Sequence, residues 1–82
     1  MAGNTFHLVI ASVGQTAYDG HALSATLPGA AGEFTVLAHH EPLVTTLKEG
    51  TITVKESSGE AKEFPVHSGV VEISGNRAVV LL

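Results

Sequence analysis

The stretch that decides the fold is residues 32–50, GEFTVLAHHEPLVTTLKEG. It contains two short apolar runs, residues 34–37 and 43–47, on either side of the polar segment Ala38-His39-His40-Glu41-Pro42. Pro42 fixes its own φ angle and biases the residue before it away from the helical region, so the polar segment cannot continue as a helix. The pattern predicts two strands joined by a sharp corner. Because loops held by a rigid sheet often contact other molecules, this corner is the first candidate for an interaction site.

Short strands with alternating apolar and polar residues are predicted along the rest of the chain. Phe6, Leu8 and Ile10 share one face of the first strand, and no window has the 3.6-residue period of a helix. The predicted strands are residues 5–12, 16–18, 22–27, 34–37, 43–47, 51–55, 62–66, 70–73 and 77–82. Asp19-Gly20 is expected to stop the second strand, and residues 28–32 are expected to form a loop. Pro65 lacks an N–H, so its strand should lie at a sheet edge or carry a bulge.

These features predict an all-β fold, a small β-sandwich of eight to ten short strands in two packed sheets. Two packed sheets bury alternating apolar faces efficiently. The length of 82 residues predicts a single domain, residues 1–82. The periodicity alone does not give the order of the strands.

Composition excludes several classes of function. The net charge is −4, and the four basic residues are too scattered to form the basic stripe that nucleic acid binding requires. No apolar run approaches the roughly 18 residues of a membrane-spanning helix, and the first residues lack the charged region of a signal peptide. There is no cysteine for redox chemistry or metal binding. Charged residues are only 15% of the chain, which indicates a surface partly covered by a partner.

Catalytic, metal and cofactor sites are not expected. Adjacent residues on extended backbone point to opposite sides, so His39 and His40 are poorly placed to share one metal ion without a distant third ligand. No nucleophile is placed beside a base in a recognisable motif. Small β-sandwiches also carry biotinyl or lipoyl groups on an exposed hairpin lysine, but Lys48, Lys55 and Lys62 do not match that position. The five histidines could form a pH sensor, although surface or contact roles are the simpler interpretation.

The 32–50 stretch resembles the N-terminal β-sandwich domain of the epsilon subunit of F-type ATP synthases. That family has a pattern close to Gly-Glu-Leu/Phe-x-Ile/Val-Leu-x-x-His-x-Pro-Leu-Leu/Val-Thr-x-Leu-x-x-Gly, which residues 32–50 fit. A second block, residues 64–73 with the later Asn76 and Val79-Val80-Leu81, is similar to the family's last strands. The chain departs from the pattern at His39, where glycine or asparagine is frequent, and at Glu41, Glu49 and Ser68.

The resemblance implies a mechanical role as a non-catalytic subunit. Such domains lie on the central rotor stalk, between the gamma subunit and the membrane ring of c subunits, where they help to couple proton transport to ATP synthesis. By this resemblance Ser12, His40 and Thr45 are candidates for contact with gamma. Glu33 and Gly32, with the 28–32 loop, are candidates for contact with the c-ring. The implied location is the cytoplasmic face of the energy-coupling membrane, as a peripheral component of the complex.

Two further expectations remain open at this point. Members of the family commonly continue into two C-terminal helices that bind nucleotide in some species, whereas these 82 residues contain no helical pattern. We therefore expect this chain to fold alone and to bind gamma without binding ATP. The alternative function is a stand-alone ligand-binding or adhesion β-sandwich with no rotor role.

Overall fold

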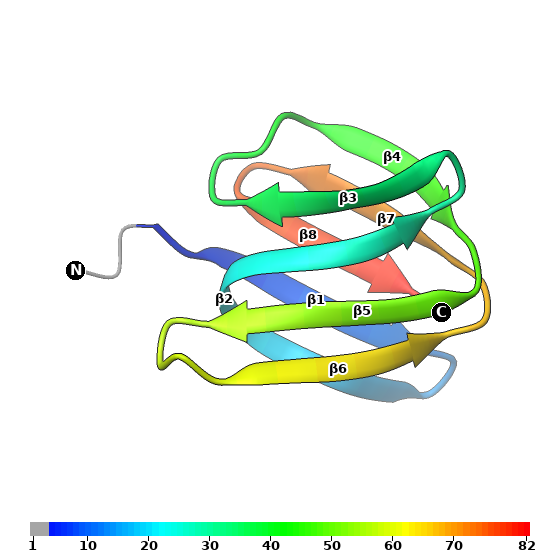
Figure 1. Ribbon diagram of the computed structural model, residues 1–82, viewed down its shortest axis with the longest axis horizontal. Helices are drawn as coiled ribbons and strands as arrows, with labels where there is room; N and C mark the ends of the chain where they lie inside the picture. The colour runs from blue at the N-terminus through cyan, green and yellow to red at the C-terminus, as the bar shows by residue number, and fades with distance from the viewer. Residues whose placement is uncertain (1–3) are drawn as a thin grey trace.

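The structure is a computed structural model that describes residues 4–82, and this part of the chain contains eight strands and no helix (Figure 1). The all-β prediction is therefore confirmed. The strands are β1 (Phe6–Ser12), β2 (Gln15–Gly29), β3 (Gly32–Leu37), β4 (Leu43–Leu47), β5 (Gly50–Glu56), β6 (Ala61–Val66), β7 (Gly69–Ser74) and β8 (Arg77–Leu81).

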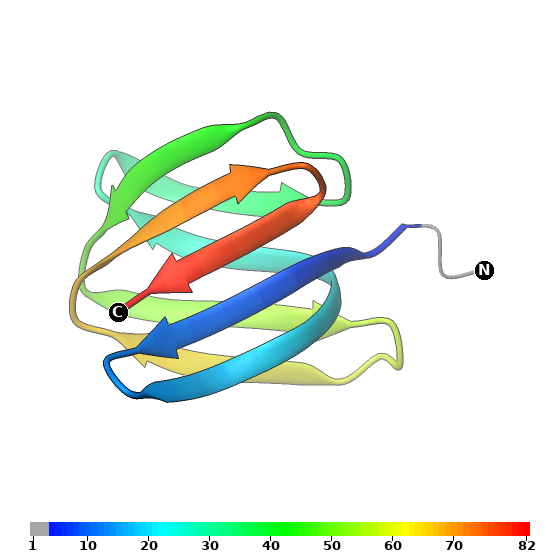
Figure 2. The ribbon, with the colours of Figure 1, turned by 180° about the vertical axis from the view of Figure 1, so that it is seen from behind.

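The strands form two packed layers that share β2. The second half of β2 pairs with β3 on one side and β5 on the other, and β6 completes that layer. The first half of β2 pairs with β1, which continues through β8 and β7 to β4 in the other layer. Figure 2 shows this second layer from its outer side. The prediction of two packed sheets is confirmed, with β2 as the strand that joins them.

The core consists of the inward-facing residues of both layers, as the alternation predicted. Phe6, Leu8 and Ile10 of β1 are buried, and so are Ile52 and Val54 of β5. The other buried apolar residues are Tyr18, Ala22, Ala25, Leu27, Val36, Leu47, Val66, Val71, Ile73, Ala78 and Val80. No polar or charged residue of the described chain is buried. A close-packed apolar interior deforms little under load, so the sandwich is expected to behave as a rigid unit.

Two local predictions about β2 are wrong. Asp19-Gly20 does not stop the chain, because Asp19 pairs with Val9 and Gly20 pairs with Leu8 inside one continuous 15-residue strand. Pro28 and Gly29 also belong to β2, so the predicted loop 28–32 shrinks to a tight turn before β3 begins at Gly32. By contrast, the expectation for Pro65 is confirmed, since β6 pairs only with β5 and lies at the edge of its layer.

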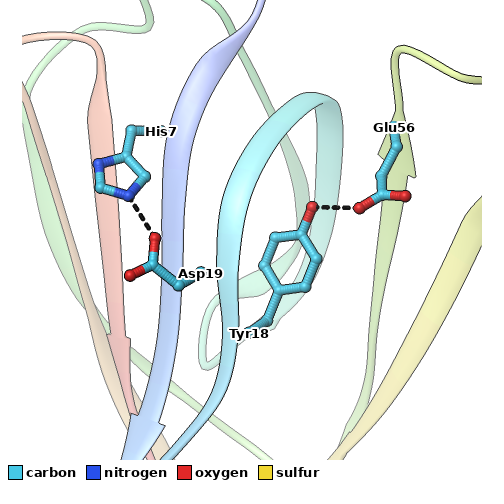
Figure 3. A network of polar contacts seen from close by, with 4 residues as sticks. All are labelled: His7, Tyr18, Asp19 and Glu56. Carbon is cyan, nitrogen blue, oxygen red and sulfur yellow. Dashed lines mark hydrogen bonds and ion pairs between the residues drawn. The ribbon is translucent and has the colours of Figure 1, made fainter.

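A polar and aromatic cluster joins the two layers where the first half of β2 approaches β6. The Tyr18 hydroxyl donates a hydrogen bond to Glu56 Oε2 at 2.6 Å (Figure 3). The edge of one ring meets the face of the other in the pair Tyr18–Phe64, with ring centroids 5.7 Å apart, and Lys62 Nζ lies 5.8 Å from the Tyr18 ring centre. This cluster closes one side of the sandwich. The opposite side, between β3 and β4, has no pairing between its two strands in the described chain.

Candidate protein-binding surface

The predicted corner connects β3 of one layer to β4 of the other. Leu37 O accepts a hydrogen bond from the His40 N–H at 3.2 Å, which closes a four-residue turn. His39, the third residue of that turn, has a φ of +61°. A left-handed third residue is the position where such turns usually place glycine or asparagine, although histidine is also enriched there. The assumption of extended backbone at His39 and His40 is therefore wrong, because His39 lies in a turn.

Within the corner, His40 is partly buried and its ring is held in one orientation. Its Nδ1 lies 2.7 Å from the carbonyl oxygen of Glu41. Because a carbonyl oxygen can only accept a hydrogen bond, Nδ1 carries the proton in the neutral ring and Nε2 is the acceptor nitrogen. His39 is exposed. The corner therefore offers a partner one fixed imidazole, at His40, together with a neighbouring exposed ring.

The corner is anchored to the β7–β8 turn by Asn76. The His39 N–H donates to Asn76 Oδ1 at 2.7 Å, and Asn76 Nδ2 donates to the carbonyl oxygen of Thr5 at 3.0 Å. The Asn76 carbonyl also accepts from the His7 N–H at 3.2 Å. One side chain thus connects the corner, the start of β1 and the turn before β8.

A cleft of about 290 Å³ opens between β3 and β4, the two edge strands that do not pair with each other. Its lining is mostly apolar and includes Phe34 and Leu43, with one carboxylate, Glu33, and one hydroxyl, Thr45. Gly32 also lines it. The structure therefore brings Gly32, Glu33 and Thr45 together, although the sequence-based assignment had placed Thr45 with Ser12 and His40.

Ser12 lies at the opposite end of the molecule from His40. Ser12 ends β1 beside the β1–β2 turn, whereas the corner lies at the end where β1 begins (Figure 1). The molecule measures 34 Å along its longest axis. A single partner that touches both residues must therefore extend along the sandwich rather than meet it at one point.

The surface between these two residues carries exposed apolar side chains that the sequence analysis did not single out. Val44, Val70 and Leu81 are 68%, 40% and 57% exposed. Val70 and Leu81 are paired neighbours, and Val44 lies diagonally beside Val70, since Thr46 is the residue opposite it. We call this side of β4, β7 and β8 the outer face. The sequence analysis predicted these three strands without assigning faces to their residues, and the pairing of β7 with β4 and β8 brings the three side chains together.

The remaining histidines are distributed over the surface. His7 and His21 stack with ring centroids 5.4 Å apart, and His7 Nε2 lies 2.6 Å from Asp19 Oδ1 (Figure 3). Across residues 4–82, no group of three or more histidine or acidic side chains has the arrangement needed to hold a metal ion. In the same part of the chain, no helix is long and apolar enough to cross a membrane. The corner, the cleft and the outer face remain as the candidate contact surfaces.

The fold and its surfaces define a small two-layer β-sandwich with a polar corner and exposed apolar side chains on its outer face. Residues 5–82 match the family model described as "ATP synthase, Delta/Epsilon chain, beta-sandwich domain". The chain belongs to that family, and the resemblance noted in the sequence is confirmed.

Relatives in the family are bacterial ATP synthase epsilon chains. The chain is 42% identical over 65 residues to that of Sulfurimonas denitrificans, covering 79% of this chain and 50% of the relative. It is 31% identical over 78 residues to that of Delftia acidovorans, covering 95% of this chain and 56% of the relative. The chain thus spans about half the length of these relatives.

Two solved assemblies contain a chain with the same fold. One is a structure of Euglena gracilis mitochondrial ATP synthase, described as OSCP/F1/c-ring, with a TM-score of 0.88 at 19% identity over 94% of this chain and 49% of that chain. The other is the central stalk and c-ring of Tetrahymena thermophila mitochondrial ATP synthase, with a TM-score of 0.74 at 11% identity over 92% of this chain and 60% of that chain. At these identities the likeness concerns the fold.

Proposed function

We propose that this chain is a non-catalytic central-stalk component of an F-type ATP synthase. In this role it links the gamma subunit to the c-ring and supports the coupling of proton transport to ATP synthesis. The family match over residues 5–82 carries the proposal. The two assemblies with a chain of the same fold, both of which contain the c-ring and one of which is described as the central stalk with the c-ring, support it. The location that follows is peripheral, on the cytoplasmic face of the energy-coupling membrane, through the complex.

Gamma would contact the outer face and the two ends of the sandwich that flank it. Ser12 and His40 mark those ends, and Val44, Val70 and Leu81 supply apolar area between them. Thr45 would be reached from the mouth of the cleft between β3 and β4. An elongated partner fits this arrangement because the contact residues extend along the molecule. Burial of the exposed apolar side chains would stabilise the complex by about 25 cal/mol for each Å² of apolar surface removed from water.

The c-ring would meet the β2–β3 turn and the start of β3. Gly32 and Glu33 are exposed there, and Glu33 is the only charged residue that lines the cleft. A carboxylate beside an apolar floor suits a partner loop that offers a hydrogen-bond donor or a positive charge next to an apolar side chain. An exposed pair of this kind contributes only about 0–1 kcal/mol, so Glu33 would orient the contact more than it would strengthen it.

The test is a titration of purified gamma subunit with this chain, followed by calorimetry and by co-elution. We expect a 1:1 complex whose affinity falls when Val70 and Leu81 are both changed to Ser. The matched control is Ser57→Ala and Ser58→Ala in the exposed β5–β6 loop, which should leave the affinity unchanged. No heat and no co-elution at tens of micromolar protein would rule out the stalk role and favour a stand-alone sandwich.

A further inference from the structure

We propose that Asn76 is a positioning residue for the corner, where its side-chain amide fixes the backbone from which His40 faces a partner. Asn76 lies in the turn between β7 and β8, whereas His40 lies in the corner between β3 and β4. No local sequence pattern links the two residues. The inference rests on the proposed function in one respect only. Gamma is the partner whose affinity reports the geometry of the corner.

The corner needs an anchor from outside its own strands. A normal hairpin turn is held by the ladder of the two strands that it joins, but β3 pairs with β2 while β4 pairs with β7 and, at one position, with β2. Residues 38–42 therefore cross from one layer to the other without ladder support. One hydrogen bond, from the His40 N–H to the Leu37 carbonyl at 3.2 Å, closes the turn itself. The hydrogen bond from the His39 N–H to the Asn76 side chain ties this segment to the β7–β8 turn.

The orientation of the Asn76 amide is determined by its partners. A backbone N–H can only donate and a backbone carbonyl can only accept, so the oxygen must face His39 and the nitrogen must face Thr5. Reversing the amide would break both bonds. Asn76 therefore bridges the corner and the start of β1, with hydrogen bonds of 2.7 Å to the His39 nitrogen and 3.0 Å to the Thr5 oxygen.

The bond also secures a backbone conformation that is unfavourable for the residue present. His39 has a φ of +61°, a region in which side chains with a Cβ atom are disfavoured. Its N–H is bound by Asn76 in that conformation, and the next residue is His40. Loss of the Asn76 side chain would release His39 to the ordinary region of φ and would change the direction in which the His40 ring leaves the corner.

The sharpest variant is Asn76→Gly. Asn76 itself has a φ of +60° beside Gly75 at +57°, as expected for a two-residue hairpin turn with two left-handed residues. Glycine tolerates that conformation, so the variant removes the side chain while it preserves the turn. Asn76→Asp is a partial rescue, since a carboxylate oxygen can still accept from the His39 N–H but cannot donate to the carbonyl oxygen of Thr5. Gly75→Asn is the matched control, because an added Cβ atom there meets no atom within 4 Å and asparagine tolerates the left-handed φ of +57°.

Two measurements on the isolated protein follow the corner directly. Hydrogen exchange of the His39 amide should be at least tenfold faster in Asn76→Gly, intermediate in Asn76→Asp, and near the wild-type rate in Gly75→Asn. The imidazole nitrogen spectrum of His40 should change from a single Nδ1–H tautomer to a mixture in Asn76→Gly. A residue that only stabilised the fold would leave the His40 tautomer unchanged.

The third measurement is the affinity for gamma at high salt, where the charge of the Asp variant is screened. Asn76→Gly should weaken binding three- to tenfold, but should add little in a His40→Asn background, because the two changes act on one contact. Additive losses, an unchanged gamma affinity or an unchanged His39 exchange rate would each overturn the positioning role. If the wild type does not bind gamma, the stalk role fails, and the tautomer of His40 in Asn76→Gly then decides the inference by itself.

Discussion

Tyr18 shows how one side chain can hold two layers together and leave a measurable signature. Burial raises the pKa of Tyr18 to about 12, and the hydrogen bond to Glu56 and the charge of that carboxylate act in the same direction. The neutral phenol is therefore stabilised in the folded state. The contribution is fully present below pH 10, the ordinary value, and is lost as the pH rises toward 12, because only the unfolded chain releases its proton readily in that window.

We expect the free energy of unfolding to fall by up to about 1.4 kcal/mol per pH unit between pH 10 and 12 because of this residue. Tyr18→Phe should remove that part of the slope and lower the stability at neutral pH by about 1 kcal/mol through loss of the hydrogen bond. Urea unfolding at several pH values measures both quantities. An identical alkaline slope in the Phe variant would contradict the assignment.

His40 and His39 differ in ways that a single substitution can separate. His40→Asn removes a partly buried ring held by the Glu41 carbonyl, whereas His39→Asn introduces a residue that accepts the left-handed φ and keeps the N–H that binds Asn76. We expect His40→Asn to weaken gamma binding by about 1 kcal/mol, roughly fivefold, and His39→Asn to change it little. Calorimetric titration gives both values, and equal losses with folding intact would assign the contact to the corner as a whole.

At this scale the sequence predicted which side chains point inward but not which polar groups meet. Alternation in a strand depends on backbone geometry alone, so Phe6, Leu8 and Ile10 could be placed from their spacing. The bond between Asn76 and His39 depends on how two turns of different strands approach each other. The position of Thr45 in the cleft could not be predicted for the same reason, because β3 and β4 come together without pairing.

The long strand β2 is the element that gives the sandwich its form. Asp-Gly usually marks a turn, and the sequence predicted one there. The pairing of Asp19 and Gly20 with β1 overrides that local preference. Gly20 serves a different purpose, because a Cβ atom at this position would lie 3.0 Å from the Tyr18 hydroxyl oxygen and 3.2 Å from the nearest ring carbon. Local propensity cannot reveal a glycine that packs closely against a side chain rather than forming a turn.

The β2–β3 turn depends on a second glycine of this kind. A Cβ atom at Gly29 would lie 2.7 Å from the carbonyl oxygen of Gly32 and 2.9 Å from the Phe34 ring. We expect Gly29→Ala to destabilise the protein by about 1–3 kcal/mol, because the backbone oxygen cannot move aside without opening the turn. The control is Gly14→Asn, where φ is +72° and an added Cβ atom would have no atom within 4 Å. Thermal unfolding compares the two, and equal melting temperatures would contradict this explanation.

For the whole molecule, the pairing of the first and last strands is expected to limit the folding speed. Asn76 and Thr5, which are hydrogen bonded, lie 71 positions apart in the chain. Because such distant segments must meet before their contacts form, we expect refolding in milliseconds to seconds rather than microseconds. Stopped-flow fluorescence of Tyr18, the one tyrosine in a chain without tryptophan, measures the rate.

A double-jump experiment separates this phase from proline isomerisation, which takes tens of seconds. After brief unfolding the three prolines keep their native isomers, so the main phase should persist with full amplitude. A main phase in the microsecond range would show that the β1–β8 pairing is not part of the barrier.

The parallel pairing of β1 with β8 has a mechanical consequence for a protein under tension. The two strands run in the same direction, so the start of β1 and the end of β8 lie at opposite ends of the sandwich (Figure 2). A pull on the two ends of the domain is directed along both strands and tries to slide one past the other. The hydrogen bonds between residues 7–11 of β1 and residues 77–81 of β8 are then loaded at the same time, instead of being broken one after another. We therefore expect this fold to resist stretching by its ends more than a fold whose terminal strands can separate one hydrogen bond at a time.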